Sequence, residues 1–230
     1  MTSNNDGNSR MLAPAMAKYN SRRAWGAWVG LGNRPGLKPS GLFGVKTPGT
    51  RRPFIRDNLR MERSGTGPRL IIVCGLPGSG KTTLAKGLEN RLHAVRFSPD
   101  EWMDALSLDI YDEERRGKIE ALQWKFAREL LALGLTVIIE WGTWGRSERD
   151  NLRIGARALG AAVELHYLSA PTDVLFERIQ RRGLEKPPIE RDALFRWSEI
   201  FQVPTPEEMA LFDKPLTRFR LKPDPPPGPG

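Results

Sequence analysis

The chain is poor in cysteine and histidine and has no long apolar run. Its one cysteine, Cys74, rules out disulfide bonds within the chain and favours a reducing compartment, so we expect a cytoplasmic location. With His93 and His166 as its only histidines, zinc sites and nucleophilic triads built on histidine are not expected. No apolar stretch approaches the ~18 residues that a membrane-spanning helix needs, so no membrane contact is expected.

Acidic residues are scarce only in the first part of the chain. Residues 1–68 hold 12 Lys and Arg against three Asp and Glu, and this excess accounts for the whole net charge of +9. Residues 1–66 also contain repeated glycine and proline without a sustained period, which predicts a basic leader that is disordered or loosely ordered. Such a leader can bind polyanions weakly, so nucleic acid is a possible partner. At the other end, residues 223–230 form a proline-rich tail.

The chain does contain an unbroken phosphate-binding pattern. An apolar run at 70–74 precedes nine residues with the pattern G-x-x-x-x-G-K-[ST] at their start, namely Gly75, Leu76, Pro77, Gly78, Ser79, Gly80, Lys81, Thr82 and Thr83. The three glycines let the backbone curl with its N–H groups pointing inward. The helix expected to begin near Gly80 adds unpaired N–H groups and the positive end of its dipole. The sequence therefore predicts that these nine residues bind a nucleoside triphosphate.

Two side chains of the pattern have separate expected tasks. Lys81 can reach the β- and γ-phosphates, and the Thr82 hydroxyl can complete the coordination shell of Mg²⁺. The alternative is a glycine-rich turn between a strand and a helix that holds no ligand. The strand before the turn, the helical pattern after it and the Lys-Thr pair favour the functional interpretation. ATP and Mg²⁺ are therefore the expected cofactors.

From Arg69 onwards, strand-like and helix-like stretches alternate, which is typical of a parallel sheet covered by helices. The expected strands are at about 69–74, 94–97, 135–139 and 161–168, with a last one at 216–221. A long helix is expected over 112–133, with Asp112 as its N-cap. Its buried face is expected to comprise Ile119, Leu122, Phe126, Leu130 and Leu133.

The order of these features resembles a known group of proteins. Gly-x-Pro-Gly-Ser-Gly-Lys-Thr-Thr-Leu-Ala at 75–85 is followed by Ser-x-Asp at 98–100, a long third strand, and an arginine-rich helix ahead of Thr-Pro-Glu-Glu at 205–208. Together these features resemble the P-loop kinases related to polynucleotide kinase. This group of small AAA-type ATP-binding proteins includes the zeta-toxin and chloramphenicol phosphotransferase branches. The resemblance covers about residues 69–213.

The resemblance carries expectations about fold and activity. It implies an α/β fold of three layers, the P-loop NTPase fold, with a five-stranded and mainly parallel sheet and a helical lid. It implies a kinase domain over residues 67–222, between the leader and the tail. It also implies transfer of the γ-phosphate of ATP to a hydroxyl group.

Asp100 is the strongest candidate outside the phosphate-binding pattern. It stands at the C-terminal end of the second expected strand, where open α/β sheets bind their ligands. A carboxylate there can accept the proton of an attacking alcohol, and the similar kinases place their general base in this Ser-x-Asp position. The alternative is an N-cap for the helix that follows. One residue can fill both roles, and we expect Asp100 to be the base.

Glu140, Arg178 and Arg182 are further candidates. Glu140 ends the third strand, where P-loop enzymes often keep an acid for Mg²⁺ or its waters, and it is either that acid or a solvated charge. Arg178 and Arg182 share one helix face, and a break at Gly183 follows them. Closure of such a lid would bring guanidinium groups to the transferring phosphate, where Lys81 also acts. The alternative is a solvated basic face.

Two tryptophans and two arginines follow the third strand. Trp141 and Trp144 are expected either to stack on an aromatic substrate or to cap the core, with the core favoured for one of the two. Arg146 and Arg149 are placed to grip an acidic or phosphorylated substrate, although a surface role is favoured for both.

The leading interpretation is an ATP- and Mg²⁺-dependent P-loop kinase that phosphorylates a hydroxyl of a small molecule, such as a nucleoside, a sugar or an antibiotic-like alcohol. A small acceptor is favoured because the chain beyond the leader has no excess of positive charge to hold a polyanion. One alternative is a polynucleotide 5′-hydroxyl kinase that uses the basic leader. The other is a nucleotide-binding ATPase or switch that transfers nothing.

Overall fold

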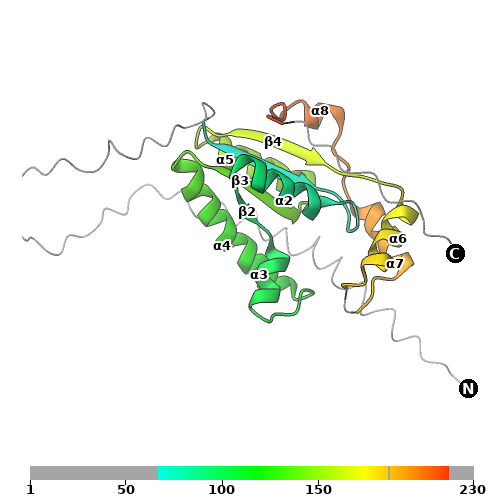
Figure 1. Ribbon diagram of the computed structural model, residues 1–230. Helices are drawn as coiled ribbons and strands as arrows, with labels where there is room; N and C mark the ends of the chain where they lie inside the picture. The colour runs from blue at the N-terminus through cyan, green and yellow to red at the C-terminus, as the bar shows by residue number, and fades with distance from the viewer. Residues whose placement is uncertain (1–66, 186, 218–230) are drawn as a thin grey trace, which may run out of the picture.

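Four parallel strands form the core of the protein. The computed structural model describes residues 67–185 and 187–217, and within them the strands stand in the order β2-β3-β1-β4 (Figure 1). Their bounds are Arg69–Cys74 for β1, Val95–Phe97 for β2, Thr136–Gly142 for β3 and Ala162–Tyr167 for β4. The prediction of an α/β fold with a parallel sheet is confirmed. Of the fifth strand expected at 216–221, residues 216 and 217 are not in a strand, and the rest lie outside the described residues.

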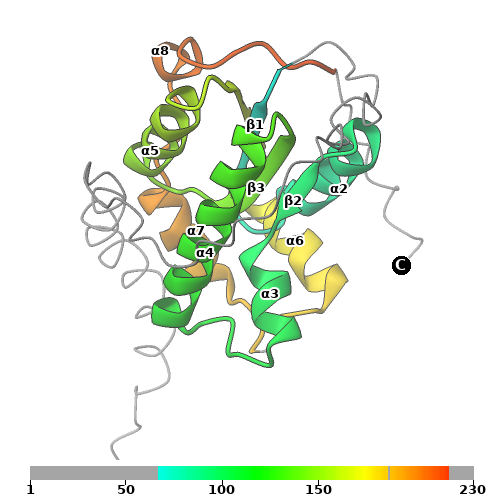
Figure 2. The ribbon, with the colours of Figure 1, turned by 90° about the vertical axis from the view of Figure 1, so that its left-hand side faces the viewer.

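Helices cover both faces of the sheet, so the three expected layers are present. On one face α2 packs against Ile71, Val73 and Ile138. On the other face α4 and α5 pack against the main apolar core, and Figure 2 shows α2 and α5 on opposite sides of the sheet. The helix bounds are Lys81–Leu92 for α2, Pro99–Ala105 for α3, Glu113–Ala132 for α4, Arg146–Arg157 for α5, Thr172–Arg182 for α6, Arg191–Ile200 for α7 and Pro206–Met209 for α8.

The strands β1 and β3 are apolar on both faces because helices cover both. Residues 70–74 and 137–139 are fully buried, as expected for central strands of a parallel sheet. Helices α6 and α7 lie beyond the carboxyl ends of these strands (Figure 1). Within residues 67–185 and 187–217, no helix is long and apolar enough to cross a membrane.

Helix α4 turns a different face to the sheet than its sequence predicts. Leu122, Phe126 and Leu133 were expected in the core, and this is wrong, because they are 44%, 42% and 67% exposed. Leu130 is partly buried and Ile119 is buried, as expected. The residues that α4 buries are Arg116, Ile119, Glu120, Gln123, Trp124, Ala127 and Leu131.

A close contact with α5 accounts for this orientation of α4. The Trp124 ring lies where a side chain at Gly155 would be, since a Cβ at that glycine would stand 2.7 Å from Trp124 Cζ2. A glycine on α5 therefore makes room for the largest side chain of α4. Burying an indole there outweighs burying Phe126 and Leu122, whose positions turn toward solvent as a result.

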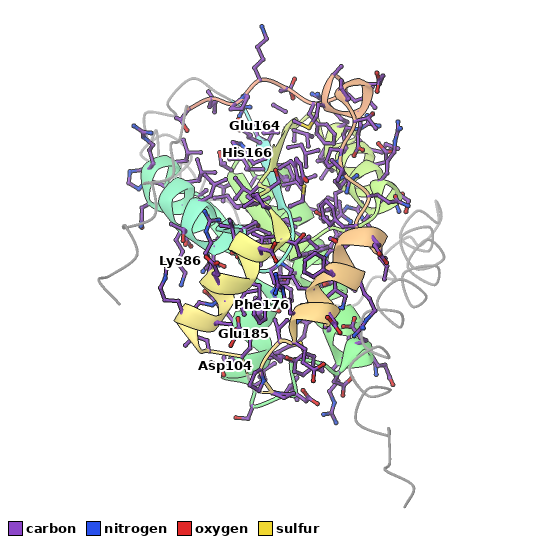
Figure 3. The ribbon with its side chains drawn as sticks, turned by 90° about the vertical axis from the view of Figure 1, so that its right-hand side faces the viewer. Lys86, Asp104, Glu164, His166, Phe176 and Glu185 are labelled. Carbon is purple, nitrogen blue, oxygen red and sulfur yellow. The ribbon has the colours of Figure 1, made fainter. Side chains whose placement is uncertain are left out.

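A buried charged cluster sits at the far end of the sheet from α6. Glu164 of β4 accepts hydrogen bonds from Arg69 Nη1 at 2.6 Å and from the backbone N–H of Leu216 at 3.0 Å, and it pairs with His166 Nε2 at 2.8 Å. Figure 3 shows Glu164 and His166 well away from Glu185, which follows α6. The hydrogen bond from His166 helps to hold the pKa of Glu164 below its ordinary value, against the effect of burial. This cluster attaches the residues after α8 to the sheet.

Arg149 of α5 is fully buried, so the expectation of a surface position for it is wrong. Its Nε and Nη2 donate to the two carboxylate oxygens of Glu208, at 2.6 Å and 3.0 Å. Its remaining hydrogen bonds go to backbone carbonyls of Thr143 (3.0 Å), Trp144 (3.3 Å) and Gln202 (2.8 Å). Arg149 therefore ties the loop after β3 to the segment between α7 and α8. Arg146 is half exposed, as expected, and pairs with Asp150.

We expect Arg149→Met to destabilise the fold strongly, because it leaves the carboxylate of Glu208 buried without its partner. The expected loss is about 3–5 kcal/mol in the free energy of unfolding, measured by urea denaturation. Arg146→Met is the matched control on the same helix, with a change below about 0.5 kcal/mol. Equal effects of the two substitutions would contradict the role assigned to Arg149.

Candidate active site

The nine residues from Gly75 to Thr83 form a tight loop between β1 and the start of α2. Gly75, Gly78 and Gly80 have positive φ values of 145°, 78° and 92°. A Cβ at Gly78 would lie 2.7 Å from the carbonyl oxygen of Leu175, and one at Gly75 would collide with that of Leu168. Both the backbone conformation and the available space therefore require glycine at these positions. Gly80 is the N-cap of α2, so the first N–H groups of this helix open onto the loop.

The polar groups of the loop fit a triphosphate. Ser79 Oγ is buried and has no hydrogen-bond partner among the described residues. Lys81 Nζ donates to the carbonyl oxygen of Leu76 at 2.9 Å, so the ammonium group lies over the loop. Burial lowers the pKa of Lys81, and the charges of Glu140 and Asp100 oppose this. An ammonium, the helix N-terminus and a buried hydroxyl together are suited to phosphate oxygens.

Thr82 and Glu140 lie in direct contact. Thr82 Oγ1 donates to Glu140 Oε1, and Arg96 Nη1 donates to Glu140 Oε2 at 2.9 Å. Burial raises the pKa of Glu140 above its ordinary value, although the Thr82 hydroxyl and the Arg96 charge oppose this. A hydroxyl and a carboxylate side by side are oxygen donors of the kind that Mg²⁺ takes, since this ion uses few protein oxygens and completes its shell with phosphate and water. The ion would supply positive charge to the β- and γ-phosphates.

Arg96 is a functional candidate that the sequence analysis missed. Besides Glu140, it donates to Glu89 of α2 at 2.9 Å and to Glu101 of α3 at 2.6 Å. Its side chain is buried in spite of its charge. Three carboxylates from separate elements thus converge on one guanidinium group, which fixes the position of Glu140. The available signal was a single arginine inside an otherwise apolar strand.

Asp100 occupies the second position of α3, after Pro99. Ser98 stands at the N-cap, so the alternative that Asp100 is the N-cap of this helix is wrong. The side chain of Asp100 is 70% exposed, and Arg116 Nη2 of α4 donates to its Oδ1. Arg116 is buried and also donates to the carbonyl oxygen of Ile110 at 3.1 Å. Arg116, also missed at the sequence level, therefore orients the carboxylate of Asp100.

One cavity of about 260 Å³ joins these groups. Nine of the site residues predicted from the sequence line it, namely Pro77, Gly78, Gly80, Lys81, Thr82, Thr83, Asp100, Glu140 and Arg182. It is also lined by Arg116, which the sequence analysis did not consider. The cavity therefore brings the phosphate-binding loop and the carboxylate of Asp100 together at the carboxyl edge of the sheet.

The two arginines of the expected lid differ in their contacts and in their position relative to the cavity. Arg182, at the end of α6, lines the cavity and donates to Glu185. Arg178 is not among the lining residues, and its Nη1 donates to the carbonyl oxygen of Gly78 at 3.4 Å. The hydroxyl of Tyr111, which also lines the cavity, donates to the carbonyl oxygen of Pro187 at 3.3 Å. The segment after α6 therefore contacts the segment between α3 and α4.

Comparison with known proteins agrees with this architecture. Residues 70–204 match the family model described as AAA domain, and the chain belongs to this family. The prediction that it is related to the P-loop kinases is confirmed. Adenylyl-sulfate kinases of Shewanella sp. (strain W3-18-1) and Shewanella putrefaciens are each 31% identical to it over 125 residues, which are 52% of this chain and 60% of each relative. The chain thus spans about 60% of the length of the curated relatives that it matches.

Several solved structures have a partly similar fold at low sequence identity. A gluconokinase from Sinorhizobium meliloti 1021 is 21% identical with a TM-score of 0.45, over 62% of this chain and 79% of that one. Kti12 from Chaetomium thermophilum in complex with ADP-AlF3 is 21% identical with a TM-score of 0.45, over 60% and 82%. The Pnkp1/Rnl/Hen1 RNA repair complex contains a chain that is 24% identical with a TM-score of 0.49, over 66% and 48%.

We expect Glu140→Gln to weaken the effect of Mg²⁺ on ATP binding by about 10- to 100-fold, because the amide cannot attract a hydrated cation as the carboxylate does. The measurement is ATP affinity titrated with Mg²⁺, and affinity in EDTA should not change. Since the pKa of Glu140 is raised, its carboxylate is lost on acidification at a higher pH than that of an ordinary glutamate. The Mg²⁺ effect in the unaltered protein should therefore fall as pH decreases toward that range.

Glu89→Gln is the matched control for this prediction. Glu89 also pairs with Arg96, but it is not among the residues that line the cavity. Its substitution should leave the Mg²⁺ dependence unchanged. If both variants lose the Mg²⁺ effect equally, the effect comes from Arg96 and not from a carboxylate at the metal.

Proposed function

We propose that the protein is an ATP- and Mg²⁺-dependent phosphotransferase that moves the γ-phosphate of ATP to a hydroxyl of a small molecule. The observation that carries the proposal is the single cavity lined by Lys81, Thr82 and Asp100. It puts a phosphate-binding loop and a proton acceptor around one cavity, as transfer to an alcohol requires. The relation to P-loop kinases supports the same class of reaction.

In this proposal each group has one task. The loop amides and Lys81 hold the phosphates, and Thr82 with Glu140 places the Mg²⁺. The acceptor oxygen bonds to the γ-phosphorus, the bond to the bridging oxygen of ADP breaks, and Asp100 takes the proton of the acceptor hydroxyl. Arg116 is a positioning residue, since its bond directs the Asp100 carboxylate.

The lid arginines take separate tasks in the proposal. Arg182 lines the cavity and is placed to offset negative charge on the phosphoryl group once it leaves Glu185. Arg178 supports the phosphate-binding loop through the carbonyl of Gly78. Arg178 therefore acts on the geometry of the loop. Its position in the sequence had suggested a different role, namely neutralising the charge of the transferring phosphoryl group.

The charges around the cavity favour a small acceptor over a nucleic-acid end. Its basic lining residues are Lys81, Arg116 and Arg182, and its acidic ones are Asp100, Glu113, Glu140 and Glu185. The wall thus has no positive excess to hold a polyanion. The name of the curated relatives points to adenylyl sulfate as their acceptor, so this compound belongs in any panel of candidate alcohols.

We expect Asp100→Asn to lower phosphate transfer by about 10²- to 10⁴-fold while ATP affinity is kept, because the amide cannot accept the acceptor's proton. The measurement is transfer of label from γ-labelled ATP to a panel of alcohols and 5′-hydroxyl oligonucleotides. Asp104→Asn is the control, since Asp104 lies on the same helix but not among the lining residues. A switch that only hydrolyses ATP would label no acceptor and would be indifferent to both substitutions.

The proposal also divides the chain into a basic leader at 1–66, a kinase domain at 67–222 and a tail at 223–230. Because the leader carries the whole net charge, a polynucleotide 5′-hydroxyl kinase would depend on it. We expect removal of residues 1–66 to leave small-molecule turnover unchanged, as measured by kcat/KM at several salt concentrations. Loss of activity together with a steep salt dependence would instead favour the nucleic-acid kinase.

A further inference from the structure

One wall of the cavity is aromatic. It is lined by Trp141 of β3, by Trp144 in the loop after β3 and by Trp197 of α7. The rings of Trp144 and Trp197 have centroids 6.0 Å apart and are tilted by 59°. Trp141 and Trp144 also belong to the apolar core, so the expectation that only one of the two does is wrong. We call Trp141, Trp144 and Trp197 the tryptophan wall.

The backbone that carries Trp144 is held in an unusual conformation. Gly142 and Thr143 have positive φ values of 83° and 32°. A β-branched residue rarely adopts such a φ, and the strain persists only where the surroundings enforce it. Here Arg149 donates to the carbonyls of Thr143 and Trp144 and is itself fixed by Glu208. The buried ion pair thus keeps Trp144 at the cavity instead of letting the loop relax.

Trp141 stands on the same side of the phosphate-binding loop as Asp100. In the strand order β2-β3-β1-β4, the phosphate-binding loop follows β1, Trp141 is part of β3, and Asp100 follows β2. Trp144 comes directly after β3, and Trp197 of α7 is in ring contact with Trp144. A ligand on these rings therefore extends toward the proposed base, which favours the acceptor over the phosphates as their occupant.

The chemistry of the wall selects the acceptor. Trp141 and Trp144 are only 4% and 8% exposed, so Trp197, which is partly buried, offers the accessible indole face. An indole face offers stacking surface and few hydrogen-bond partners, so a flat ring gains there while each hydroxyl of a polyol would lose contacts with water. Charged groups of both signs line the cavity, so the charges alone do not separate ring-bearing from ringless alcohols. We propose that the acceptor alcohol carries an aromatic or heteroaromatic ring that stacks on the tryptophan wall. This inference rests on the proposed function for the transfer step, but the ring site is itself a binding property.

The test is a binding experiment on the full chain loaded with Mg²⁺ and a non-hydrolysable ATP analogue. Adenosine and 2-phenylethanol are the ring-bearing probes, and ribitol and gluconate are the ringless ones, with affinity measured by calorimetry. We expect only the ring-bearing probes to bind. Trp197→Leu should weaken them by about tenfold or more, because the stacking partner is lost. Trp197→Phe should restore most of the affinity, and ATP affinity should change little in either variant. Because Trp197 also packs against two core clusters, Trp197→Leu should lower Tm, and Trp197→Phe should lower it less.

The outcomes separate this inference from the proposed function. The inference is overturned if ribitol or gluconate binds more tightly than the ring-bearing probes, or if neither ring-bearing probe binds. It is also overturned if Trp197→Leu binds the ring-bearing probes with undiminished affinity. Competition between adenosine and the ATP analogue for one site also overturns the inference, because the rings would then hold the donor nucleotide. If a ring-bearing alcohol binds as expected but no alcohol in the panel takes label from ATP, the ring site stands and the phosphotransferase proposal fails.

Discussion

The parallel pairing of β2, β3 and β1 is the constraint on which the candidate site depends. Phe97 is opposite Ile139, and Cys74 is opposite Gly142. All three strands therefore end at one edge of the sheet, and the loop after β1, Glu140 and Asp100 emerge side by side. A slip of one residue in β3 would turn Glu140 to the opposite face and remove its contact with Thr82. Helices on both faces prevent such a slip by burying both sides of β1 and β3.

Buried arginines fix the positions of the side chains that the strand ends bring close together. Arg96 joins β2, α2, α3 and β3 through carboxylates, and Arg149 joins the loop after β3 to α8. Arg116 holds Asp100 from α4. Each is buried at a desolvation cost that only several hydrogen bonds can offset. Since that cost is met with carboxylates and carbonyls near the cavity, these arginines position the site as well as stabilise the fold.

The sequence predicts those parts of the structure that depend on local rules. The phosphate-binding loop, the ends of β1 and β2 and the N-cap Asp112 follow from spacing and residue type, and the Asp112 side chain accepts from the N–H of Arg115 at 3.0 Å. The third strand was expected over 135–139 with Glu140 at its end, but β3 continues to Gly142 and includes Trp141. The buried face of α4 cannot be predicted in this way, because Gly155 on another helix makes the room for Trp124. Arg149 was misplaced for the same reason, since its partner Glu208 is 59 residues away. A charged residue looks the same in the sequence whether it is solvated or paired in the core.

Lys81 and Arg182, the two cations that the proposal places at the phosphates, are each held by an oxygen of their own segment. Lys81 donates to the carbonyl of Leu76, and Arg182 donates to Glu185. Each group keeps further N–H donors, since an ammonium has three and a guanidinium five, so phosphate oxygens can bind to it without displacing the acceptor that it already has. Neither side chain has to be ordered from solvent, because each is already held close to the cavity. The two acceptors differ in place. Lys81 is held within the phosphate-binding loop itself, whereas Arg182 is held by a carboxylate on the segment that contacts Tyr111. A phosphate that draws Arg182 from Glu185 would therefore act on that segment, and one that binds Lys81 alone would not.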